Sequence, residues 1–443
     1  MDADPQDLRG HVLWAPRAWV AGRWHDGVQL AIDATGHWRE VNCGVAPAPE
    51  AIRLQGPALP GLVDAHSHAF QRAFAGLAET RSGEHDDFWS WRDRMYGVAL
   101  RITPSELRAV ARQLCTELLQ GGYTQLCEFH YLHHQPDGRA YDHELEMAWA
   151  VADGAADAGI GLTLLPVLYE RAGFMQPELR PDQRRFATDA RCVLRMRDGI
   201  RAAKRPNVNA GVAIHSLRAA APESIRALMK GCDGDEGPIH IHVAEQTAEV
   251  DDCLAATGRR PIEWLAHEGL LDARWQLVHA THTTPAEIDA VAASGAGVVL
   301  CPSTEANLGD GLPDLARWLA SSTPLTLGSD SHVERDWPAE LRLLEYGQRL
   351  TQRRRNVCAA PELGEPSTAA RLFKRVLAGG AAAAGLRRWG LEAGARADLL
   401  VLPAPTAPLV EGISGDPLDT LVFAPGASPA FAQVLVAGRR VEP

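Results

Sequence analysis

The chain has 443 residues, enough for a large hydrophobic core, and its 46% hydrophobic and 23% charged residues are ordinary for a globular protein. The formal net charge of −12 disfavours binding to nucleic acid or to an anionic membrane. The 8 cysteines include no CxxC pair, and no stretch of about 20 apolar residues occurs, so no cysteine-type zinc site, disulfide framework or membrane span is expected. The N-terminus lacks the features of a signal peptide, and we expect a cytoplasmic protein.

Both ends of the chain are rich in short predicted strands. WVAGRW (19–24) and GVQLAID (27–33) are bounded by Gly and Asp-Gly, which favour hairpin turns. ADLLVLP (397–403) and AFAQVLVAGRRV (430–441) have the same character. We therefore predict a small β-sandwich-like domain formed from residues 1–57 and 391–443, and a catalytic domain formed from residues 58–390.

The middle of the chain contains eight apolar runs, each ending in polar residues and followed by a helical stretch. Continuous apolar runs are typical of parallel strands buried on both faces. Thr103-Pro104-Ser105-Glu106 and Thr284-Pro285-Ala286-Glu287 have the pattern of helix starts. Eight strand–helix units predict an α/β fold of the (β/α)8, TIM-like barrel type. The rival, a doubly wound open sheet, normally has a Gly-rich phosphate turn after its first strand, and this chain has none there. The runs cover residues 61–68, 123–131, 160–170, 209–218, 238–245, 275–282, 295–307 and 324–332.

Histidines stand at the ends of the first and fifth runs. Side chains two apart on a strand point the same way, so His66 and His68 can chelate one divalent ion. His242 ends the fifth run, and Glu245 follows where the chain leaves the sheet; a carboxylate near a ligand, but not itself a ligand, is typical of a catalytic metal site. His240 lies deeper in the run, and we interpret it as a core residue or as one that supports the ligands.

The sixth and eighth runs end in polar residues of the same kind. His279 lies nearer the apolar run than His282, so it should project into the barrel mouth. Asp330 can be a metal ligand, a proton acceptor or a helix N-cap. His332 is expected to be an ordinary loop residue. Each signal alone is also explained by surface histidines or a cap, but the combination over four strand ends is specific.

This combination resembles the amidohydrolase superfamily, whose members use a (β/α)8 barrel and a metal-activated water. The resemblance covers most of the chain, including GARADLLVL (394–402). Binuclear members bridge two ions with a carbamylated Lys, or sometimes a Glu, at the fourth strand, whereas this run ends in HSLR (215–218). The resemblance therefore implies one divalent ion per chain, most simply Zn²⁺, although Fe²⁺ and Mn²⁺ accept the same ligands. The implied ligands are His66, His68, His242 and Asp330.

The position of Glu245 resembles the deaminase branch of that superfamily, which hydrolyses C–N bonds at amidine-like carbons and releases ammonia. The resemblance implies that Asp330 and His279 take a proton from the attacking water. Glu245 would hold the substrate nitrogen and protonate the leaving amine. Arginines near the barrel mouth indicate an anionic small-molecule substrate with two carboxylates, because Arg binds carboxylates in a bidentate manner. The alternative for any one Arg is a surface salt bridge.

Five longer segments resemble a branch that acts on a small linear amidine carrying two carboxylates; they are residues 66–79, 239–254, 277–284, 301–312 and 327–350. That resemblance implies that Gln71, Arg92, Tyr131 and Arg218 hold the carboxylates, with His215 and Glu245 beside the amidine. The alternatives are a deaminase of a heterocycle or nucleoside, a non-enzymatic barrel protein and a phosphate-binding barrel. A homodimer is one assembly that the sequence allows.

Overall fold

The fold is a closed parallel barrel, as the eight apolar runs predict. The structure is a computed structural model that describes residues 6–81, 86–404, 415–426 and 430–442. The strand order is β10-β11-β12-β13-β14-β6-β7-β8-β9, and β10 also pairs with β8, so β9 and β10 together fill the fourth position and close the ring. The doubly wound alternative is therefore wrong. The strands are β6 (Leu62–Ser67), β7 (Tyr123–His130), β8 (Gly161–Leu168), β9 (Val208–Ala210), β10 (Val212–Ile214), β11 (Ile239–Val243), β12 (Trp275–His279), β13 (Gly297–Leu300) and β14 (Leu325–Leu327).

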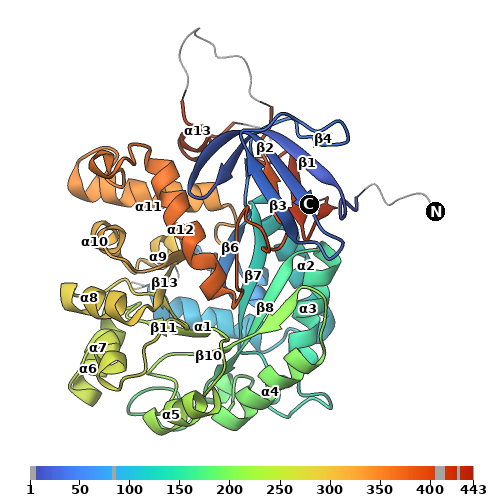
Figure 1. The fold of residues 1–443 in the computed structure, drawn as a ribbon. Coiled ribbons are helices and arrows are strands. Elements are labelled where there is room, and N and C mark those ends of the chain that lie inside the picture. The colour runs from blue at the N-terminus through green and yellow to red at the C-terminus, as the bar shows by residue number, and fades with distance from the viewer. Residues whose placement is uncertain (1–5, 82–85, 405–414, 427–429, 443) are drawn as a thin grey trace.

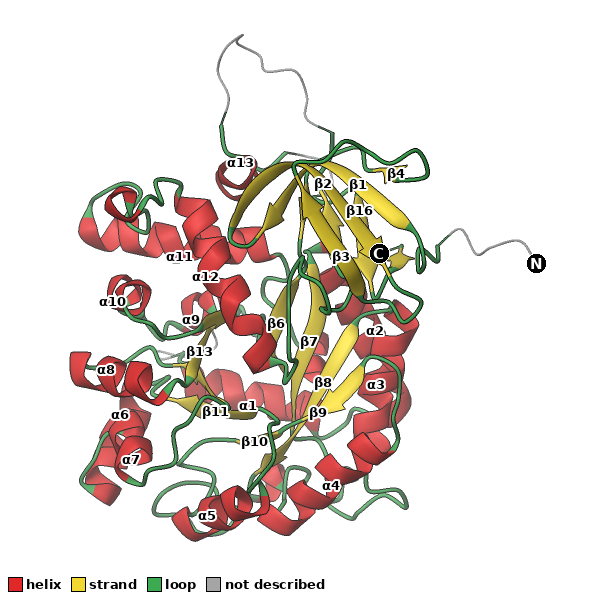
Figure 2. Ribbon diagram, in the orientation of Figure 1, coloured by secondary structure: helices red, strands yellow, loops and turns green. Residues whose placement is uncertain are grey.

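Helices surround these strands (Figure 2). The capping boxes expected at Thr103 and Thr284 are both formed. The predicted run 295–307 contains a strand only up to Leu300, because Pro302 begins a helix. No helix in the described part of the chain is long and apolar enough to cross a bilayer. The helices are α1 (Phe88–Ala99), α2 (Pro104–Gln120), α3 (Glu146–Ala158), α4 (Ala190–Ala202), α5 (Pro222–Gly231), α6 (Thr247–Thr257), α7 (Pro261–His267), α8 (Pro285–Ser294), α9 (Pro302–Leu308), α10 (Leu315–Ala320), α11 (Trp337–Gln352), α12 (Thr368–Ala383) and α13 (Pro417–Phe423), with short 3-10 helices η1 (Ala69–Ala73), η2 (Pro181–Gln183) and η3 (Pro361–Leu363).

A second sheet combines strands from both ends of the chain, shown in blue and red in Figure 1. Its order is β17-β16-β15-β5-β1-β2-β3, with β4 beside β1. Ala21 and Gly22 both have positive φ, which is typical of a type I′ turn and joins β1 to β2. The expected break at Asp26-Gly27 does not occur, since β2 runs through it. The strands are β1 (Val12–Val20), β2 (Arg23–Ile32), β3 (Trp38–Cys43), β4 (Ile52–Arg53), β5 (Ala58–Leu59), β15 (Leu399–Val401), β16 (Gln433–Val436) and β17 (Arg439–Val441).

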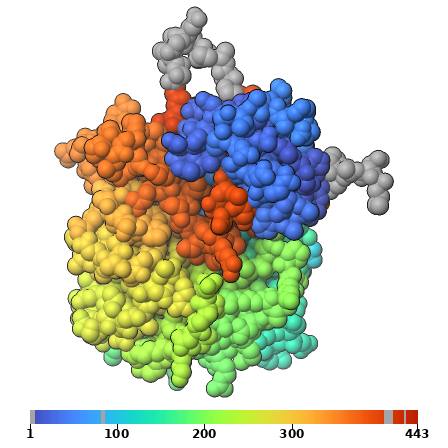
Figure 3. Space-filling view, in the orientation of Figure 1, coloured from blue at the N-terminus to red at the C-terminus, as the bar shows by residue number. Residues whose placement is uncertain are grey.

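The small sheet has a hydrophobic core of its own, which includes Leu30 and Trp38 from the N-terminal strands and Leu399 and Leu435 from the C-terminal strands. In the space-filling view the blue N-terminal residues form one end of the molecule, next to orange and green residues (Figure 3). The exact domain boundaries, at residues 57/58 and 390/391, stay a prediction.

The floor of the barrel is closed by the C-terminal end of α12. The carbonyl of Ala383 accepts hydrogen bonds from Cys127 Sγ at 3.5 Å and from His240 Nε2 at 2.9 Å. The carbonyl of Ala384 accepts from Thr163 Oγ1 at 2.9 Å and from Asn209 Nδ2 at 2.8 Å. Side chains from four barrel strands thus satisfy carbonyls that a helix end leaves unpaired. His240 is a core residue with this role, as its depth in the run indicates.

Candidate active site

Four side chains converge at the C-terminal ends of β6, β11 and β14. His66, His68, His242 and Asp330 each offer one ligand atom, and these atoms all lie within 4.8 Å of one another. Nε2 of His242 lies 3.0 Å from Nε2 of His66 and 3.3 Å from Nε2 of His68. Oδ1 of Asp330 lies 3.4 Å from the Nε2 atoms of His66 and His68. The structure therefore brings together the whole ligand set that the resemblance implies.

The hydrogen bonds of two rings decide which nitrogen faces the centre. Nδ1 of His68 lies 3.0 Å from the carbonyl oxygen of Phe129, and Nδ1 of His242 lies 2.9 Å from that of His215. A carbonyl oxygen only accepts, so each Nδ1 carries the proton and each Nε2 presents a lone pair. Burial lowers the pKa values of these two rings and of His66, which favours the neutral ligand form. Lone pairs aimed at one point repel one another without a cation between them, so these residues fit one divalent ion.

The loop after β14 is held tightly against β6. Asp330 has φ +51°, and its backbone N–H donates to the carbonyl of His66 at 2.9 Å. His332 is fully buried, with Nε2 3.3 Å from Ser67 Oγ and Nδ1 3.0 Å from Ser329 Oγ. The expectation that His332 is an ordinary loop residue is therefore wrong. It joins the end of β6 to the β14 loop and helps to fix Asp330 in a strained conformation.

A second group of acids surrounds His279. Its Nε2 lies 3.7 Å from Glu245 Oε1 and 3.7 Å from Asp330 Oδ2, and its Nδ1 lies 3.4 Å from Glu305 Oε1. Burial opposes protonation of the ring, but the three carboxylates outweigh it and raise the pKa of His279 to about 10. Burial also raises the pKa of Glu245 to about 7, against the attraction of His279. Perturbed acids and a base in one cavity are typical of a proton-transfer site.

Several buried carboxylates near the site were not predicted. Glu249 accepts from the backbone N–H groups of Ala244 at 3.3 Å and Glu245 at 3.0 Å, so it fixes the turn that carries Glu245. Glu128 accepts from Ser67 Oγ at 2.8 Å and from the backbone N–H of Ala69 at 2.9 Å, which holds the chain on both sides of His68. These acids position the site through the backbone.

Asp310 is a further acid that the sequence did not single out. Its Oδ1 accepts a hydrogen bond from the side chain of Gln246, and its Oδ2 is buried without a partner in the described part of the chain. Burial, reinforced by the charge of Glu245, raises the pKa of Asp310 to about 9. A protonated Asp310 is therefore the form that this environment favours.

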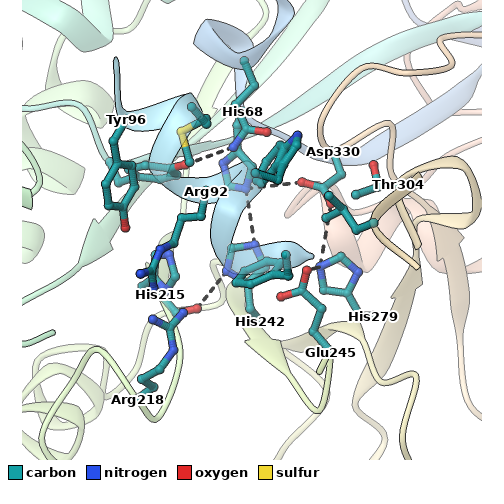
Figure 4. A pocket seen from close by; sticks show the side chains of 16 residues that line it. His68, Arg92, Tyr96, His215, Arg218, His242, Glu245, His279, Thr304 and Asp330 are labelled. Atoms are coloured by element: carbon teal, nitrogen blue, oxygen red, sulfur yellow. Dashed lines mark hydrogen bonds and ion pairs between the residues drawn. The ribbon is translucent and has the colours of Figure 1, made fainter. Parts of the chain in front are cut away.

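A cavity of about 500 Å³, including its open mouth, is lined by His68, His242, Glu245, His279 and Asp330 from these groups. The cavity has two sides (Figure 4). One side carries Tyr96, Arg92, His215 and Arg218, and the other carries Glu245, His279 and Asp330. His68 and His242 lie between the two sides. All five residues predicted to bind substrate line this cavity, namely Gln71, Arg92, Tyr131, His215 and Arg218. Six further lining residues were missed: Phe88, Trp91, Met95, Tyr96, Thr304 and Leu308.

The substrate side of the cavity carries positive charge and unpaired polar atoms. Arg218 is 8% exposed, and its guanidinium has no ion pair or hydrogen bond among the described residues. Arg92 Nε and Gln71 Oε1 are buried without a partner there, while Gln71 Nε2 donates to Tyr131 Oη at 3.0 Å. Arg72, by contrast, is directed away and pairs with Glu117 at 2.7 Å. Buried polar groups without partners are costly, and an anionic ligand would satisfy them.

The amidohydrolase family model matches residues 58–441, which is most of the chain. The chain belongs to the amidohydrolase family. The formimidoylglutamate deiminase of Pseudomonas aeruginosa is 44% identical over 97% of this chain and 94% of its own length. The 5-methylthioadenosine/S-adenosylhomocysteine deaminase of Natronomonas pharaonis is 29% identical over 78% of this chain and 72% of its own length. Among solved structures, an amidohydrolase from Brucella melitensis superposes with a TM-score of 0.90 at 40% identity, over 97% of this chain and 94% of that one.

These similarities confirm the family that the strand-end pattern indicated, and this amidohydrolase is a hydrolase homologous to formimidoylglutamate deiminase. The heterocycle and nucleoside deaminases are more distant relatives.

Proposed function

We propose that this amidohydrolase converts N-formimino-L-glutamate and water to N-formyl-L-glutamate and ammonia, a step of histidine degradation. The observation that carries the proposal is the two-sided cavity, in which an acid–base cluster faces the guanidinium groups of Arg92 and Arg218. Arg218 has no carboxylate partner in the described residues, and Arg92 has only a 3.5 Å contact with the exposed Asp93. A linear substrate with an amidine at one end and two carboxylates at the other fits both sides. The near full-length similarity to a formimidoylglutamate deiminase supports the same substrate.

His66, His68, His242 and Asp330 would hold one divalent ion, for which we propose Zn²⁺. When bound, such an ion lowers the pKa of water towards about 7 and so supplies a nucleophile at neutral pH. The preformed centre of three neutral imidazole Nε2 atoms and one carboxylate suits this ion.

Proton transfer falls to the acids around His279. Asp330 Oδ2 would receive the proton lost by the water that attacks the formimino carbon. His279 Nε2 lies 3.7 Å from that oxygen, and the ring, protonated at neutral pH, would donate a hydrogen bond that stabilises the charge on the attacking oxygen. The water oxygen becomes the formyl oxygen as Glu245 takes the second proton of that water and passes it to the nitrogen, and the C–NH₂ bond breaks so that the nitrogen leaves as ammonia. The amidine is cationic near neutral pH, and this charge favours the ionised form of Glu245 when the substrate binds.

Recognition of the other end of the substrate falls to Arg92, Arg218, Gln71 and Tyr131. The two guanidiniums supply charge and planar N–H donors, and the Gln71–Tyr131 pair supplies neutral donors. His215 is held by its neighbours, with Nδ1 3.2 Å from Ser216 Oγ, and faces the cavity beside His242. Burial lowers its pKa well below the usual range, so it meets the amidinium as a neutral ring.

Ammonia release tests the proposal. Purified protein is offered N-formimino-L-glutamate and, in parallel, adenosine, S-adenosylhomocysteine, guanine and a pterin. We expect turnover of the first compound alone. Turnover of a ring compound without turnover of N-formimino-L-glutamate would establish the heterocycle or nucleoside deaminase instead. A homodimer in solution stays a prediction, which sedimentation of the same preparation would test.

A further inference from the structure

Both arginines of the cavity contact one tryptophan, Trp89. The guanidinium carbon of Arg92 lies 4.6 Å from the centre of the Trp89 ring, and that of Arg218 lies 5.4 Å from it. Arg92 stands one turn after Trp89 on α1, so these two side chains lie on the same side of the helix. Arg218 arrives from the loop after β10. One indole thus joins two cationic groups that are far apart in the sequence.

The two guanidiniums need such a support because little else compensates their charge. Arg92 has one weak ion pair, at 3.5 Å to Asp93, whose side chain is 55% exposed. The guanidinium carbon of Arg92 also lies 5.6 Å from the centre of the Tyr96 ring, farther than from Trp89. Arg218 has no ion pair among the described residues. Like charges held close together repel one another, particularly where water is scarce. The negative face of an indole attracts cations, and Trp is the aromatic residue that does so best.

The indole itself is held in place. The backbone N–H groups of Trp89 and Ser90 donate to the Asp87 side chain at 3.0 and 3.1 Å, which fixes the first turn of α1. The ring packs edge-to-face on Phe88, with 5.0 Å between the ring centres and 89° between the planes. Phe88 in turn lines the cavity. Trp89 is therefore anchored through both its backbone and its ring.

We propose that Trp89 is a positioning residue that holds the guanidiniums of Arg92 and Arg218 beside each other, so that together they receive the two carboxylates of one substrate. Trp89 does not touch the reacting atoms and acts through the arginines. This inference rests on the proposed function, because the dicarboxylate is that function's substrate.

The test compares Trp89→Leu, which removes the π face, with Trp89→Phe, which keeps one. Trp149→Leu is the matched control: Trp149 lies under Arg205 at 4.2 Å on the outside of the barrel. KM and kcat are measured with N-formimino-L-glutamate and with N-formiminoglycine, which has a single carboxylate. Melting temperatures show whether the variants fold.

For Trp89→Leu we expect KM for the diacid to rise about tenfold while kcat changes less than about threefold. KM for the single-carboxylate substrate should change less. Trp89→Phe should recover most of the loss, and Trp149→Leu should match the wild type. An unchanged KM for Trp89→Leu would overturn the inference, and so would equal damage in Trp89→Leu and Trp89→Phe.

Binding of glutarate, measured by calorimetry, separates this inference from the proposed function. A wild type that releases no ammonia from N-formimino-L-glutamate refutes the function. If it still binds glutarate, and Trp89→Leu binds about tenfold more weakly, the positioning role is supported. Equal glutarate affinity in the two proteins, or no binding by the wild type, overturns the positioning role.

Discussion

Glu305 Oε1 lies 3.4 Å from Nδ1 of His279, on the edge of the ring opposite the nitrogen that faces Glu245 and Asp330. The same oxygen accepts the backbone N–H of Cys301 at 2.9 Å, which fixes the carboxylate in place. A carboxylate behind an imidazole sets both the orientation of the ring and its affinity for a proton. Glu305 therefore governs how His279 takes part in proton transfer.

The first prediction concerns the variant Glu305→Gln. The amide keeps the size and the contact with Cys301 but removes the negative charge, which is one cause of the raised pKa of His279. We expect kcat to fall by about 10²-fold, with KM and bound metal little changed. Steady-state kinetics and metal analysis check this. A wild-type kcat would show that Glu305 serves only to hold Cys301.

The second prediction concerns metal removal. Because the Nε2 atoms of His66, His68 and His242 face one another, the protein without a cation should be less stable than the loaded protein. We expect one ion per chain, loss of ammonia release on chelation, and recovery with one equivalent of Zn²⁺. The melting temperature should rise when the ion returns. His242→Ala should not recover, whereas two ions per chain would contradict the proposed centre.

The third prediction concerns Arg218→Met, which preserves the length of the side chain but not its charge. We expect kcat/KM for the diacid to fall about 10²-fold or more, because the bound carboxylate would lose its charged partner. The ion content should equal that of the wild type, since Arg218 is no ligand. Arg205→Met, a surface Arg paired with Asp153, is the control and should retain full activity. Equal activity of Arg218→Met and the wild type would remove the carboxylate-binding role.

The fourth prediction concerns pH and the fully buried Glu340, which accepts from the backbone N–H and the hydroxyl of Ser303. Burial raises the pKa of Glu340 from 4.5 to about 8. At pH values between these two pKa values, the Glu340 carboxyl has lost its proton in the unfolded chain but keeps it in the folded chain. The free energy of unfolding therefore falls as pH rises. Urea unfolding should therefore show that Glu340→Gln loses less free energy of unfolding between pH 5 and pH 8 than the wild type does, by a difference on the order of 3 kcal/mol. Exposed Glu50→Gln should follow the wild type, and parallel curves for Glu340→Gln would contradict the prediction.

The barrel was predictable because most of its strands are buried on both faces and so appear as short runs rich in apolar residues. The same rule made His66, His242 and Asp330 candidates, since parallel strands bring their ends together although they are distant in the sequence, and the family resemblance implied that they are ligands. The chelating pair His66 and His68 needed only the two-residue period of a strand.

Other residues of the site could not be predicted from local sequence patterns. Glu128, Glu249 and Glu305 bind backbone N–H groups, and a sequence does not show which amides a fold leaves unpaired. The left-handed backbone at Asp330 depends on contacts with β6, which lies far away in the sequence. The burial of His332 depends on the same contacts, so the sequence did not predict it. The contact of Trp89 with Arg218 exists only once α1 meets the loop after β10.

The pairing of β5 with β15 has a consequence for biosynthesis. Strands β1, β2 and β3 leave the ribosome first, yet their sheet is completed by strands that emerge last. Until then β5 has an open edge, and exposed strand edges invite association between chains. Nascent or truncated chains that lack residues 399–441 should therefore depend on chaperones. Aggregation of such chains should limit the yield of folded enzyme.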